Sequence, residues 1–144
     1  MSRADAIRDR VVASMEAEDG DAFELALNSA FQDRCLPAIS DLLIAVLPMT
    51  WHSRHEDVVG ALQDTRAADA VGALFDAAHA RHSYLDYDDA FGLARKCTWA
   101  LADIGTDAAK EQLHALTRCG DSVVQGYAQE RLDRWDQELD RKRR

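Results

Sequence analysis

The chain has 144 residues, 47% hydrophobic and 30% charged, so it can form one folded domain and is too apolar to be disordered. Its net charge is −9, and residues 1–130 carry 11 basic against 22 acidic side chains. This acidic body argues against binding to nucleic-acid phosphates. It suits a basic protein partner, or it only keeps the chain soluble.

Cysteine usage and the N-terminus indicate a cytoplasmic protein. Cys35, Cys97 and Cys119 are odd in number and form no CxxC motif, so we expect neither disulfides nor a cysteine metal site. The first residues contain no apolar signal segment. The longest apolar stretch, residues 42–47, is too short to span a membrane.

Apolar residues recur every three or four positions from the N-terminus onward, which predicts helices. Residues 1–35 read as two of them. Gly20 ends the first helix, and Asp21 with Glu24 resembles a capping box that starts the second. Pro37 suits the first turn of the next helix, because its missing N–H has no partner to lose there.

The later helices also have start and stop signals. Ser53 and Glu56 form a full capping box. Gly105 closes one helix and Thr106 caps the following one. The last helix ends in the basic residues 141–144, which suit the negative end of its dipole.

The helices repeat in pairs. Val71 falls on Leu113 after a shift of 42 positions, whereas Leu101 falls on Leu132 after a shift of 31. Because one helix pair cannot bury its own apolar face, the pairs must stack. We predict an all-α fold, a short right-handed α-solenoid of about eight helices in a single domain, residues 1–144. It comprises capping helices at 1–35, helix pairs at 37–63, 66–104 and 107–135, and a charged end at 136–144.

Two segments of this pattern resemble a known repeat family. Residues 62–74 (LQDTRAADAVGAL) and 99–106 (WALADIGT) look like HEAT repeats of the short, phycobilisome-lyase-like kind, over about residues 37–135. That resemblance implies a fold and says almost nothing about function. Residues 51–105 are also similar to small acidic immunity proteins of bacterial toxin systems, including contact-dependent growth inhibition. This second resemblance implies a protein that binds and neutralises a toxin.

The two shifts, 42 and 31, differ by 11 residues, so the central pair carries about 11 extra residues between its helices, near 80–90. The insertion holds two of the three tyrosines, beside several aspartates. Aromatic anchors with carboxylates suit a Lys- or Arg-rich partner, and inserted loops often bind partners. Alternatively, the aromatic residues pack against neighbouring helices. The candidate partner-binding residues are Tyr84, Asp86, Tyr87, Asp88, Asp89 and Phe91.

Candidate catalytic and metal-binding motifs are weak. His52 and His55 form one HxxH pair, and His79 and His82 form another. Neither pair has a third ligand at motif spacing, so we expect a solvated helix start rather than a metal site. Cys97 lies on an apolar helix face, which indicates core packing. We expect no catalytic residue, metal or cofactor.

These observations favour a non-enzymatic protein-binding module, most specifically an immunity protein that neutralises a basic toxin domain. One alternative is a HEAT-like scaffold or accessory subunit of a lyase-like enzyme. Another is a nucleic-acid binder, supported only by the basic residues 141–144. We expect no membrane partner, and the sequence leaves the oligomeric state open.

Overall fold

The computed structural model describes residues 2–88 and 91–142, without the side chains of residues 87, 88 and 142, and the regular structure of this part is entirely helical. The described part contains nine α-helices and three short 3₁₀ helices, which agrees with the all-α prediction of about eight helices. The α-helices are α1 (Arg3–Ala17), α2 (Gly20–Gln32), α3 (Ser40–Val46), α4 (His55–Asp64), α5 (Val71–Ala77), α6 (Phe91–Ile104), α7 (Asp107–Leu116), α8 (Ser122–Asp133) and α9 (Trp135–Lys142). The 3₁₀ helices are η1 (Leu36–Ile39), η2 (Ala68–Ala70) and η3 (Ser83–Asp88).

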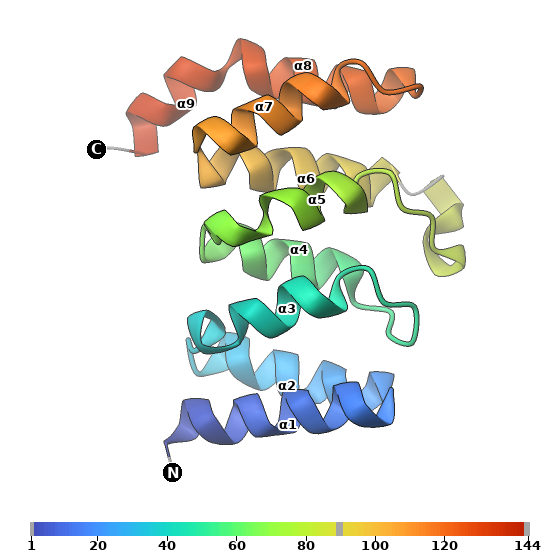
Figure 1. Cartoon of the computed structure of the whole chain (residues 1–144), viewed down its shortest axis with the longest axis vertical. Coiled ribbons are helices and arrows are strands. Elements are labelled where there is room, and N and C mark those ends of the chain that lie inside the picture. The colour runs from blue at the N-terminus through green and yellow to red at the C-terminus, as the bar shows by residue number, and fades with distance from the viewer. Residues whose placement is uncertain (1, 89–90, 143–144) are drawn as a thin grey trace.

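The helices form two layers that run along the long axis of the molecule (Figure 1). One layer holds α1, α3, α5 and α7, and the layer behind it holds α2, α4, α6 and α8. Within the second layer α4 packs on α6, and α6 packs on α8. At the N-terminal end of the stack, α1 packs on α2, η1 and α3. No described helix has the length and apolar character needed to cross a bilayer.

The core follows the repeat positions that the sequence pattern picked out. Val58, Cys97 and Ala128 occupy the same place in α4, α6 and α8, and all three are fully buried. Cys97 therefore lies in the core as expected, and burial raises the pKa of its thiol. In α3 the fully buried residues are Leu43 and Val46, whereas Leu42 is only partly buried. Each helix pair of the stack therefore buries the apolar face of the pair before it.

Two of the predicted caps are confirmed and explain how α6 ends and α7 begins. Gly105 ends α6 with φ +71°, a left-handed conformation that glycine adopts without strain. The Thr106 hydroxyl accepts a hydrogen bond from the Ala109 N–H at 3.1 Å. Both signals lie within a few residues of the helix end, so the sequence alone was sufficient to identify them.

The prediction at the α1–α2 turn is wrong in register. Glu18 ends α1 with φ 51°, so Gly20 is the first residue of α2 rather than a stop signal. Asp19 caps α2, because its carboxylate accepts from the Ala22 N–H at 3.0 Å, and Asp21 does not. A glycine suits position 20, since a Cβ there would lie 3.0 Å from the carbonyl oxygen of Trp51.

The predicted capping box at Ser53 is also wrong. Helix α4 begins at His55, its N-cap position is Arg54, and the Arg54 side chain caps nothing. The backbone N–H of His55 instead donates to the hydroxyl of Tyr84, 3.1 Å away. A residue 29 positions later in the chain thus accepts the hydrogen bond of a backbone N–H at the start of α4.

The predicted last helix is two helices, α8 and α9, separated at Arg134. The separation lets Glu138 of α9 approach Arg131 of α8, with 2.6 Å between Oε1 and Nη1. The Arg131 guanidinium lies 3.5 Å from the ring centroid of Trp99 on α6. Both charged side chains are buried, so this contact holds α9 against the stack.

Candidate functional site

One side of the stack gathers four of the connections between helices (Figure 1). We call it the loop edge. It contains the α1–α2 turn at residues 18–19, the α3–α4 connection at 47–54, the α5–α6 connection at 78–88 and the α7–α8 connection at 117–121. All the candidate partner-binding residues that the structure describes belong to the third connection or to the start of α6.

Three histidines stack on one another at the loop edge. The ring centroids of His52 and His55 are 4.2 Å apart, and those of His55 and His82 are 3.6 Å apart. His52 is 2% exposed and His55 is 1% exposed, so the expectation of a solvated helix start is wrong. The sequence pairs were misleading because His82 joins the first pair, whereas His79 is exposed and packs against Phe75.

Hydrogen bonds set the protonation of the two most buried rings. The Nε2–H groups of His52 and His55 donate to the carbonyl oxygens of Val46 and Met49, at 2.8 and 2.7 Å. These oxygens only accept, so each Nε2 carries the proton. The Nδ1 of His52 accepts from the backbone N–H of Arg54 at 3.1 Å. Because their nitrogens are engaged with the protein, the two buried rings are poorly placed to ligate a metal.

Charges and burial agree with neutral rings. Burial lowers the pKa of His52, His55 and His82, and that of His55 falls to about 4, with smaller contributions from the two neighbouring histidines. Among residues 2–88 and 91–142, no group of His, Cys, Asp and Glu is arranged to hold a metal ion. The histidine stack is therefore a packing element at neutral pH.

The Tyr84 hydroxyl joins the α5–α6 connection to α4. It donates to the Nδ1 of His55 at 2.6 Å and accepts from the backbone N–H of the same residue at 3.1 Å. Burial raises the pKa of Tyr84 above its usual value, so the hydroxyl keeps its proton for this bond. Each of its two hydrogen bonds satisfies a group of a buried residue, which fixes the position of η3.

The α5–α6 connection therefore has an inner and an outer side. On the inner side, His82 and Leu85 are buried, and Leu85 is 4% exposed. On the outer side, Asp86 is exposed and the Tyr84 ring is 40% exposed. Different residues of the segment thus pack and face solvent, and contact of the exposed ones with a partner stays a prediction. Of the other candidates, Tyr87 and Asp88 lie in η3 with side chains outside the description, and Asp89 lies outside the described residues.

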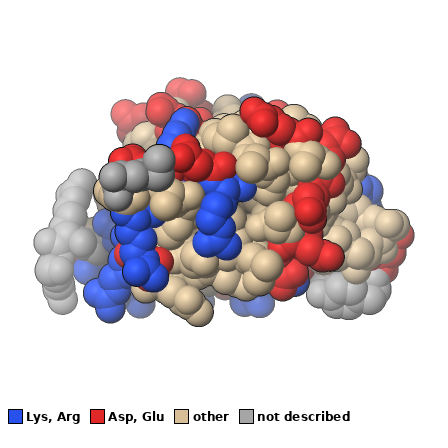
Figure 2. Space-filling view, turned by 90° about the horizontal axis from the view of Figure 1, so that it is seen from below, with Lys and Arg blue, Asp and Glu red and all other residues tan. Residues whose placement is uncertain are grey.

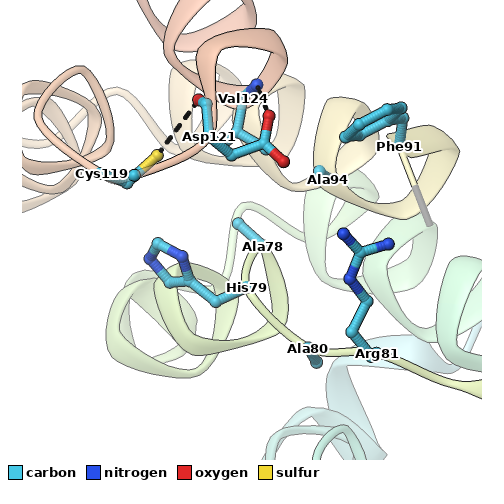
Figure 3. Close-up of a pocket in the computed structure, with 10 residues that line it drawn as sticks. Ala78, His79, Ala80, Arg81, Phe91, Ala94, Cys119, Asp121 and Val124 are labelled. Atoms are coloured by element: carbon cyan, nitrogen blue, oxygen red, sulfur yellow. Dashed lines mark hydrogen bonds between the residues drawn. The ribbon is translucent and has the colours of Figure 1, made fainter. Parts of the chain in front are cut away.

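A pocket of about 210 Å³ separates the α5–α6 and α7–α8 connections (Figure 3). His79 and Arg81 lie on one side, and Cys119 and Asp121 lie on the other. Phe91, the last candidate residue, is half-buried at this pocket, with the Arg81 guanidinium 6.0 Å from its ring centroid. The pocket thus offers an aromatic ring and charged groups of both signs to a side chain of a partner.

Polar groups on the α7–α8 side of this pocket are already engaged with the protein backbone. The Asp121 carboxylate accepts from the N–H groups of Val123 and Val124 and so caps α8. The Cys119 thiol points to the carbonyl oxygen of Asp121, 3.6 Å away. A thiol activated for attack would need a base within hydrogen-bond reach, and its contact here is a carbonyl.

A second hollow, about 630 Å³, lies between the α1–α2 turn and the α3–α4 connection. Trp51 and Arg54 line one side. Arg54 forms an ion pair with Glu24. The exposed acidic residues Glu18, Asp19 and Asp21 line the other side. Sequence reasoning missed this acidic hollow, although five acidic residues between positions 16 and 24 were a visible signal.

Comparisons with family models, curated proteins and solved structures gave no match to this chain. The resemblance to HEAT repeats and to immunity proteins, and the handedness of the stack, therefore stay predictions.

Proposed function

We propose that this protein is a non-enzymatic protein-binding module, an immunity protein that neutralises a basic bacterial toxin domain through the loop edge. The observation that carries the proposal is η3, which projects at the loop edge and is attached to the buried His55 by the Tyr84 hydroxyl (Figure 1). A projecting segment held in this way is pre-organised, so binding costs little conformational entropy.

The surroundings of η3 suit a protein partner. The pocket beside Phe91 and the hollow beside Trp51 provide two concave sites for side chains. The exposed ring of Tyr84 provides an aromatic contact at the loop edge. Central aromatic anchors surrounded by polar groups are typical of protein interfaces.

Charge selects the kind of partner. Asp86 is exposed on η3, and Glu18, Asp19 and Asp21 line the acidic hollow. Together with the net charge of −9, these carboxylates would attract a basic surface and repel nucleic-acid phosphates. Occupying a basic active site and blocking it sterically would neutralise a toxin without any reaction.

The test is to express the chain with the product of the neighbouring gene and to measure complex formation by size exclusion and calorimetry. Asp86→Lys reverses one charge at the loop edge, and we expect it to weaken binding by about tenfold or more. Asp69→Lys is the matched control, because Asp69 is also exposed but lies on η2 at the opposite side of the stack. If the two variants bind alike, the loop edge is not the interface. If the neighbouring product forms no complex and its toxicity is unaffected, the immunity proposal fails.

A further inference from the structure

The first helix pair has one face that no other described element covers. Helix α1 packs on α2, η1 and α3, which leaves the opposite side of the α1–α2 pair open at the end of the stack. A shallow groove runs along this side. We call it the terminal groove, and it is lined by Arg10, Ala13, Ser14, Ala17, Asp19, Ala22 and Leu25.

The middle of the terminal groove is apolar and exposed. Leu25 is 61% exposed, more than any other large hydrophobic side chain among the described residues. Ala13 and Ala17 lie beside it in the groove. Small side chains let another helix approach closely, so this surface suits a helical partner.

The two ends of the groove carry opposite charges. Arg10 lies at one end and Asp19 at the other. Figure 2, which views the molecule from this side, shows most Lys and Arg on the left, among some Asp and Glu, and mainly Asp and Glu on the right, with uncharged residues between. Arg34 and Arg3, which is ion-paired with Asp33, lie at the same end, because α1 begins and α2 ends there.

We propose that the terminal groove binds a second copy of this chain in a two-fold symmetric dimer. The two-fold axis lies in the plane of the interface, runs across the helices and passes near Ala13 and Leu25. This rotation places Arg10 of each copy over the acidic end of the other and brings the apolar centres together. A two-fold interface needs a surface complementary to itself, and a face with opposite charges at its ends satisfies that condition.

Other occupants match only part of this surface. A basic protein segment would be attracted to Asp19 and repelled by Arg10. An acidic segment would be attracted to Arg10 and repelled by Asp19. An anionic membrane would be attracted to Arg10 and repelled by Asp19. A second copy matches both ends at once. Helix α1 spans about 22 Å, so the buried area is modest and the dimer should dissociate on dilution.

The test measures the mass of the full chain by sedimentation at about 150 mM salt, over concentrations from the micromolar to the hundreds of micromolar range. We expect a monomer–dimer equilibrium for the unmodified chain. Leu25→Glu should raise the dissociation constant about tenfold or more. Val123→Glu is the matched control, because Val123 is also an exposed apolar residue but lies on α8. A chain that stays monomeric throughout this range would overturn the proposal.

Charge reversal distinguishes the two-fold arrangement from any other contact. Arg10→Glu places like charges at both ends of the interface. Glu18→Arg does the same from the acidic end, where Glu18 is exposed next to Asp19 in the α1–α2 turn and, unlike Asp19, does not cap α2. Each variant alone should therefore be mainly monomeric. An equal mixture of the two should dimerise about as well as the unmodified chain. In each mixed pair the introduced glutamate faces the introduced arginine at one end, and the two unmodified residues, Arg10 and Glu18, face each other at the other end.

If the mixture stays monomeric while each variant has an unchanged circular dichroism spectrum and melting temperature, the two-fold arrangement is wrong. The result is independent of toxin binding, since it uses the chain alone. Binding of the neighbouring gene product by the Leu25→Glu variant would show separately whether the loop edge works without the dimer.

Discussion

Acidification should destabilise this protein through the buried histidine stack. The pKa of His55 is about 4 in the folded chain and 6.5 when unperturbed, so the unfolded state binds a proton more readily. Stability is therefore fully present above pH 6.5 and is lost as pH falls from 6.5 towards 4. Between pH 7 and pH 5 this single group should lower the free energy of unfolding by about 2 kcal/mol. Since burial also lowers the pKa of His52 and His82, their contributions have the same sign.

The assay is urea unfolding at pH 7, 6 and 5, followed by circular dichroism. A loss of about 2 kcal/mol corresponds to a decrease in melting temperature of roughly 6 °C for a chain of this size. His55→Gln removes the titrating group and should flatten the pH dependence, although it is less stable at pH 7. His114→Gln is the control, because His114 is exposed on α7 and lies outside the stack. If the unmodified chain and His55→Gln lose equal stability between pH 7 and pH 5, His55 is not the cause.

Three further substitutions test contacts that hold the layers together, each by thermal and urea unfolding. Tyr84→Phe leaves the buried Nδ1 of His55 without its donor and should cost about 1–2 kcal/mol; an unchanged stability would mean that η3 is not fixed by this bond. Glu138→Ala leaves the buried Arg131 charge without its closest partner and should cost about 3 kcal/mol, whereas a loss below about 1 kcal/mol would show that α9 is not held by this pair. Thr106→Ala removes the cap of α7 and should cost about 1 kcal/mol, with Thr117→Ala as a control outside any N-cap.

Periodicity predicted the helical fold and most of the core, because it depends only on residues three and four positions apart. Val58, Cys97 and Ala128 were aligned by their spacing and are all buried. The shift arithmetic placed extra residues near 80–90, and the α5–α6 connection lies there. Local caps were predicted correctly at Thr106, where donor and acceptor are three residues apart.

The candidate site was only partly predictable. The sequence drew attention to Tyr84 and Asp86 as candidate partner-binding residues of an insertion and left open whether the aromatic residues pack; both residues are exposed. It did not reveal that the Tyr84 hydroxyl starts α4, and for that reason the Ser53 capping box was wrong. The group that caps a helix must lie close to it in space. Residues 55 and 84 approach each other only when α4 and the α5–α6 connection lie side by side.

By itself, the sequence determined that the chain forms amphipathic helices, where several of them end, and that its surface is acidic. The tertiary structure alone decided which helix faces which. It brought His82 onto His55, placed Arg131 between Trp99 and Glu138, and left the α1–α2 pair with an open face of opposite charges. The physical reason is that helical periodicity shows which side of a helix is buried, whereas the neighbour on that side depends on how all the layers stack.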